Sequence, residues 1–144
     1  MREDRASGEL TAARRAVAAA SETLTARRRT LAEYEKTKDE RRDRLYENII
    51  GKPVSREQID LVQEGIAKID EEGIVKAESV RRAEDDLKAK TRNEENARDN
   101  FNAATKNRMK IDEHKADWIK REAEEQEQRA ESELEDFTRR PQDD

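Results

Sequence analysis

Acidic side chains are the most abundant groups in this chain that could do chemistry, since 36 of its 144 residues are Asp or Glu. Two carboxylates three or four residues apart lie on one face of a helix, where they can act as general acid and base. Here they alternate with 31 Lys and Arg residues, which is typical of a solvated helix surface. Catalysis also needs a concave site that excludes water, which two helices side by side do not form. We therefore expect no catalytic residues and no enzyme.

Metal binding would depend on His114, the only histidine in a chain without cysteine. Among the residues three or four positions away, only Asp117 has a side chain that commonly binds metal, so a site would need ligands from another chain. We expect a surface histidine, no metal and no cofactor. A chain without cysteine also has no disulfide framework and no thiol nucleophile.

The arginine run Arg27–Arg29, together with Arg14 and Arg15, raises the question of nucleic-acid binding. Three adjacent arginines spread around a helix instead of forming one stripe, the net charge is −5, and aromatic residues for base stacking make up only 3%. No apolar run approaches the roughly 20 residues that span a bilayer, and the start, MREDRASGEL, lacks the apolar region of a signal peptide. The sequence predicts a cytoplasmic protein that neither binds nucleic acid nor inserts into a membrane.

The elements that position these side chains must be thin, because only 32% of the residues are hydrophobic and 47% are charged. A typical globular protein has roughly 45–50% apolar residues, so a thick core is excluded. The composition leaves two classes, a disordered chain or a coiled coil that buries only one seam. The periodicity of the apolar residues decides between them.

A first helix is predicted at about residues 3–50. Glycine and proline are absent from residue 9 through 50, and apolar residues recur at a spacing of seven, with Lys38 as the exception. The seam residues of this helix are Leu10, Val17, Leu24, Leu31 and Leu45.

The stretch ENIIGKPVSREQID contains the signals that separate two helices. Gly51 is typical of a helix end and Pro53 cannot continue the helix, so we expect a turn at 51–54 with these two residues as its hinge. Ser55 and Gln58 have the spacing of a capping box, which begins a new helix.

The second helix is predicted at about residues 55–138, followed by a frayed tail at 139–144. Its seam residues are Ile59, Ile66, Val80, Leu87 and Phe101. The seven-residue frame continues through Gly73, which indicates a kink near residue 73 within one helix instead of a second turn. Because a short connection makes neighbouring helices antiparallel, the expected fold is all-α. Residues 1–144 would form a single antiparallel coiled-coil hairpin whose second helix is longer than the first.

Two registers of this hairpin agree with the apolar pattern. One places Leu45 beside Ile59, and the other, shifted by seven residues, places Lys38 opposite Gly73. The sequence leaves both registers open. In each of them the second helix extends beyond the first.

Apolar residues outside this pairing form the candidate partner interface. Trp118 lies beyond the reach of the first helix and either anchors a partner, as Trp often does, or packs internally. A cluster at the end of the hairpin either binds a partner or packs against the second helix to close the turn. The interrupted seam predicts a monomer or weak dimer. The candidate interface residues are Tyr46, Ile49, Ile50, Ile111, Trp118 and Ile119.

Three parts of the sequence resemble the YscO family of type III secretion proteins, which are relatives of the flagellar FliJ protein. They are REDRA near the start, RLYENIIGKPVSREQI with VQEGIAKIDEEG at the centre, and EHKADWIKREAEEQEQRAE near the end. The resemblance covers nearly the whole chain. It implies an α-helical antiparallel hairpin similar to the two-helix stalk of the rotary ATPase γ subunit.

The resemblance also implies a role. The chain would be a non-enzymatic cytoplasmic stalk at the base of the secretion apparatus, linking the export ATPase ring to the export gate and interacting with secretion chaperones. The helix ends around Arg5, Leu10 and Trp118 would enter the ring. The segment that meets the gate would contain Leu45, Tyr46, Ile49 and Ile50. The alternative is a generic coiled-coil tether or spacer with no secretion role.

Overall fold

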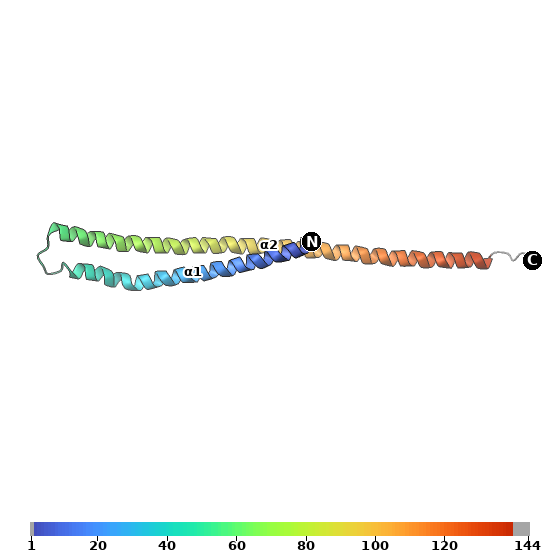
Figure 1. Ribbon diagram of the computed structural model, residues 1–144, viewed down its shortest axis with the longest axis horizontal. Helices are drawn as coiled ribbons and strands as arrows, with labels where there is room; N and C mark the ends of the chain where they lie inside the picture. Colours follow the sequence, from blue (N-terminus) through green and yellow to red (C-terminus); the bar gives the residue numbers. More distant parts are fainter. Residues whose placement is uncertain (1, 140–144) are drawn as a thin grey trace, which may run out of the picture. The chain divides into compact units, whose positions relative to one another are not determined.

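The protein consists of two long α helices in the computed structural model, which describes residues 2–139 (Figure 1). Helix α1 spans Arg2–Glu47 with 46 residues, and helix α2 spans Arg56–Arg139 with 84 residues. No β strand occurs among the described residues. The predicted fold class is confirmed, since the chain is an all-α antiparallel hairpin with a longer second helix. Residues 140–144 of the predicted frayed tail lie outside the described residues.

The first helix ends at Glu47, three residues before the predicted end. The residues after it form a turn that is closed by two backbone hydrogen bonds. The backbone N–H groups of Ile49 and Ile50 both donate to the carbonyl oxygen of Tyr46, at 3.0 and 2.9 Å. Gly51 then adopts a φ of +72°, a left-handed conformation that glycine enters without steric cost. The connection between the helices therefore comprises residues 48–55.

The second helix begins with the capping box that the sequence predicts, and this prediction is confirmed. The backbone N–H of Gln58 donates to the Ser55 side-chain oxygen at 3.3 Å, and the backbone N–H of Ser55 donates to the Gln58 side-chain oxygen at 3.0 Å. The two bonds satisfy backbone donors that would otherwise lack a partner at the start of a helix.

The contacts divide the chain into two units, which are described separately. Unit 2 comprises Gly8–Arg98, where the two helices lie side by side, and unit 1 comprises Met1–Ser7 with Asp99–Asp144.

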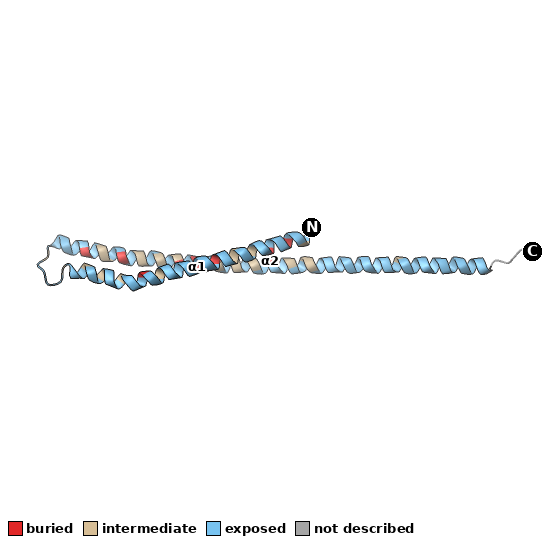
Figure 2. Cartoon of the chain, turned by 60° about the horizontal axis from the view of Figure 1, so that its bottom comes forward, coloured by how far each residue is buried: buried red, intermediate tan, exposed pale blue. Residues whose placement is uncertain are grey.

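The core of unit 2 is a single seam between the helices (Figure 2). Leu24, Val80 and Ala83 form its central cluster, and Leu31 and Leu87 pack against them. None of the described side chains is completely enclosed, as expected for a pair of helices. The buried residues of the unit are Leu10, Ala20, Leu24, Tyr34, Val62, Ile69, Val80, Ala83 and Ala97.

Large side chains of α1 pack against two glycines of α2. A Cβ built at Gly65 would lie 2.9 Å from a methyl carbon of Leu45, and one at Gly73 would lie 3.0 Å from Cε1 of Tyr34. The Tyr34 hydroxyl donates to the carbonyl oxygen of Ile69. Helix α2 is continuous through Gly73, so this glycine provides space for an aromatic ring and does not end the helix.

These contacts distinguish between the two registers. Leu45 lies against Gly65, and Lys38 and Gly73 line the same groove. Near the hairpin end, unit 2 is therefore closer to the register that places Lys38 opposite Gly73, whereas farther along the seam Leu24 packs with Val80, a pair that has the spacing of Leu45 with Ile59. Consistent with this shift, Ile59 is 38% exposed, although its spacing places it in the seam.

Unit 1 pairs only the first turns of α1 with α2. Ala6 is buried, Ala104 and Phe101 are half-buried, and Glu3 forms an ion pair with Arg108. Beyond this pairing the remaining described part of α2 in this unit is almost entirely exposed (Figure 2). The unit therefore contains a long helical segment with no second helix of its own.

Candidate partner-binding surfaces

Groups that could bind a metal are not gathered anywhere in the described part of the chain. No set of three or more His, Cys, Asp or Glu side chains there is arranged to hold a metal ion. His114 lies on an exposed part of α2. The surfaces with chemical character are instead apolar patches and ion pairs.

The hairpin-end patch of unit 2 surrounds the connection between the helices. Tyr46 and Ile50 are 42% and 69% exposed, Ile49 and Val54 are half-buried, and Ile50 lies in the turn after α1. Three members were missed as interface candidates, because the apolar pattern assigned Ile59 to the seam, and Val54 and Leu61 to no surface. We define the hairpin-end patch as Tyr46, Ile49, Ile50, Val54, Ile59 and Leu61.

The uncovered face of unit 1 is the second apolar surface. Trp118 is 64% exposed and Phe137 is 75% exposed. Ile111 and Trp118 continue the seam spacing of Ala97 and Ala104 but are mostly exposed. The exposed apolar residues of this surface are Met109, Ile111, Trp118, Ile119, Leu134 and Phe137.

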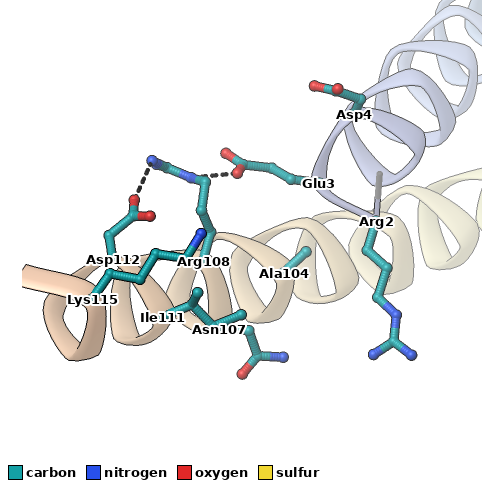
Figure 3. A pocket seen from close by; sticks show the side chains of 9 residues that line it. All are labelled: Arg2, Glu3, Asp4, Ala104, Asn107, Arg108, Ile111, Asp112 and Lys115. Atoms are coloured by element: carbon teal, nitrogen blue, oxygen red, sulfur yellow. Dashed lines mark hydrogen bonds and ion pairs between the residues drawn. The ribbon is translucent and has the colours of Figure 1, made fainter. Parts of the chain in front are cut away.

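A groove of about 640 Å³ lies in unit 1 where the first turn of α1 meets α2 (Figure 3). Arg108 stands at its edge and pairs with both Glu3 and Asp112, at 3.4 Å from the latter. Ala104 and Ile111 supply apolar surface. The groove is lined by Arg2, Glu3, Asp4, Ala104, Asn107, Arg108, Ile111, Asp112 and Lys115.

Ion pairs connect the two helices of unit 2 on their solvent-exposed sides. Arg42 contacts Asp70 at 2.7 Å and Arg41 contacts Glu72 at 3.0 Å. The hydrogen bond from Arg41 holds the pKa of the Glu72 carboxyl below its ordinary value. Such exposed pairs contribute little stability individually and weaken as salt is added. A third pair joins Arg28 to Glu84 at 3.2 Å.

Comparison with known protein families gives a match over nearly the whole chain. The model of a family described as type III secretion protein YscO matches residues 1–140. The chain belongs to the YscO family. This YscO-family chain is thus a type III secretion protein, in agreement with the resemblance seen in its sequence. Neither the curated proteins nor the solved structures contain a match to it.

In this YscO-family chain, no helix within the described residues is both long enough and apolar enough to cross a bilayer. The predicted candidate interface residues fall on two surfaces. Tyr46, Ile49 and Ile50 belong to the hairpin-end patch of unit 2. Ile111, Trp118 and Ile119 belong to the uncovered face of unit 1.

Proposed function

We propose that this YscO-family chain is a non-enzymatic stalk of the type III export apparatus, which links the export ATPase ring to the export gate and interacts with secretion chaperones. The family match over residues 1–140 carries the proposal. The stalk would act in the cytoplasm at the base of the apparatus.

The two apolar surfaces support a linking role, because a linker needs a separate surface for each partner. The uncovered face, with Trp118, is assigned to the ATPase ring, and the hairpin-end patch, with Tyr46 and Ile50, is assigned to the gate. Each surface exposes large apolar side chains that are common at binding hot spots.

The high charge of the chain suits contacts that form and break repeatedly. With 47% charged residues, its surface attracts partners through exposed groups that are individually weak and screened by salt. We expect binding that is measurable at low salt and weaker at about 0.15 M salt.

Binding of purified chain to the cognate export ATPase, and separately to the cytoplasmic domain of the export gate, tests the proposal. Trp118→Ala is expected to weaken ATPase binding at least about tenfold and to leave gate binding unchanged. Ile50→Ala is expected to do the reverse. Ile74→Ala removes an equally exposed apolar side chain outside both surfaces and serves as the control.

Failure of the unmodified chain to bind either partner at low salt would overturn the proposal. Together with normal secretion in a strain that lacks the chain, this result would favour a generic coiled-coil tether. Co-purification with a secretion chaperone tests the remaining part of the assignment.

A further inference from the structure

The uncovered face of unit 1 has a charge pattern that is divided into two halves. Residues 106–121 contain six basic and three acidic residues, a net charge of +3. Residues 122–138 contain one basic and eight acidic residues, a net charge of −7. A second helix of the same sequence would match this pattern only when it runs antiparallel, because a parallel partner would place one acidic half against the other.

One side of this segment also carries apolar and charged residues in an order that suits pairing with a second copy of the same helix. At 3.6 residues per turn, its members fall within an arc of about 120°. Such an arc is close to the apolar width of an ordinary surface helix. The residues on this side are Ile111, Lys115, Trp118, Glu122, Gln126, Ala130, Glu133 and Phe137.

An antiparallel pair centred on Glu124 brings complementary residues of this side together. Ile111 of one copy lies at the level of Phe137 of the other, and Trp118 lies at the level of Ala130. Trp118, the largest side chain, therefore faces a small one, and Ile111 and Phe137 form an apolar layer at each end of the pair. Lys115 reaches the level of Glu133, so opposite charges meet between the two apolar layers.

We propose that two copies of this chain associate through α2 residues 111–137 as an antiparallel, two-fold symmetric pair. The pairing would cover the exposed residues Ile111, Trp118 and Phe137 in both copies. It goes beyond the stalk role and does not depend on it, because the proposal concerns the purified chain alone. Self-association and ATPase binding would compete for Trp118.

Mass as a function of concentration, measured by sedimentation equilibrium on the full chain, tests the pairing. Trp118 is the only tryptophan, so a concentration-dependent blue shift of its fluorescence would report burial at this site. Trp118→Ala is expected to raise the dimer Kd at least about tenfold.

A charge swap tests which residues face each other. Lys115→Glu alone and Glu133→Lys alone each place like charges together at both ends of the pair, and each is expected to raise the dimer Kd about tenfold. The double variant restores opposite charges and is expected to return the Kd to within about threefold of the unmodified value. Lys120→Glu and Glu124→Lys make the same changes on the opposite side of the helix and should leave the Kd unchanged.

The orientation is measured with spin labels, which the cysteine-free chain accepts at single introduced cysteines. In the antiparallel pair, labels at Glu125→Cys would be close together, whereas labels at His114→Cys would be separated by about 30 Å along the axis. Short distances from both positions would indicate a parallel pair and overturn the proposal. A chain that stays monomeric at high concentration, or a double swap that remains as weak as the single variants, would also overturn it.

Discussion

A methyl group at position 73 tests whether Tyr34 determines how the helices of unit 2 pair. A Cβ at Gly73 would lie 3.0 Å from Cε1 and 3.5 Å from Oη of Tyr34. The distance to Cε1 is shorter than an ordinary van der Waals contact. The ring has little freedom to move, because Tyr34 is buried and its hydroxyl donates to the carbonyl oxygen of Ile69. Gly73→Ala should therefore disturb the packing of the ring or its hydrogen bond.

The expected magnitude follows from three opposing effects. Alanine is favoured over glycine within a helix by about 1 kcal/mol. Overpacking of a filled site costs about 1–3 kcal/mol, and loss of the Tyr34 hydrogen bond costs about 0.5–1.5 kcal/mol. Gly73→Ala is thus expected to lower the free energy of unfolding by about 1–2 kcal/mol. After Tyr34→Ala has emptied the site, the same change should raise it by about 1 kcal/mol.

Urea unfolding followed by circular dichroism measures all four variants of this double-mutant cycle. Gly8→Ala is the matched control, because a Cβ at Gly8 meets no atom within 4 Å. It should stabilise the chain by about 1 kcal/mol whether or not Tyr34 is present. Equal stabilisation by Gly73→Ala in both backgrounds would refute the reasoning, since the ring would then not be confined by this site.

Three further changes act on local features of unit 2. Gly51→Ala should cost about 1–2 kcal/mol of unfolding free energy in urea titrations, since its φ of +72° strains a residue with a Cβ, and an unchanged midpoint would contradict this. Ser55→Ala should cost about 1 kcal/mol, and Gln58→Ala should lower the unfolding free energy further in that background, because each side chain accepts a separate backbone N–H of the capping box; no further loss in the double variant would contradict this. Because Arg41 lowers the pKa of Glu72, the stabilisation is present at neutral pH and is lost as the pH falls below the ordinary glutamate value of about 4.3. Acid should therefore destabilise the unmodified chain slightly more than Glu72→Gln, and parallel pH profiles in urea unfolding would show that the pair contributes nothing.

The fold class could be predicted because its signals are local. A seven-residue apolar period, the glycine and proline of the connection, and the Ser55–Gln58 spacing each act within a few residues. The register could not be predicted, since it depends on which α1 side chain enters which glycine position of α2. The sequence pattern gives Gly65 no role and interprets Gly73 as a kink, whereas in the structure Leu45 and Tyr34 pack against these two positions.

The candidate surfaces could be predicted only where they do not depend on the register. Exposure of Trp118 followed from the unequal helix lengths alone. Exposure of Ile59 did not, because it depends on the register and on the early end of α1 at Glu47. What binds to either surface depends on molecules outside this sequence, which only the family match addresses.

The two glycine contacts also have a mechanical consequence. Leu45 and Tyr34 are eleven residues apart on α1, but Gly65 and Gly73 are eight residues apart on α2, so roughly 16 Å of one helix spans the same interval as roughly 12 Å of the other. Between the two contacts α1 therefore has more backbone than α2, which is taken up by the reach of the Tyr34 ring and by a curve of α1 away from α2, and Arg41 and Arg42 pair with Glu72 and Asp70 across this interval. Bending stiffness should be lowest in this interval, and a load along the hairpin would be taken up there first.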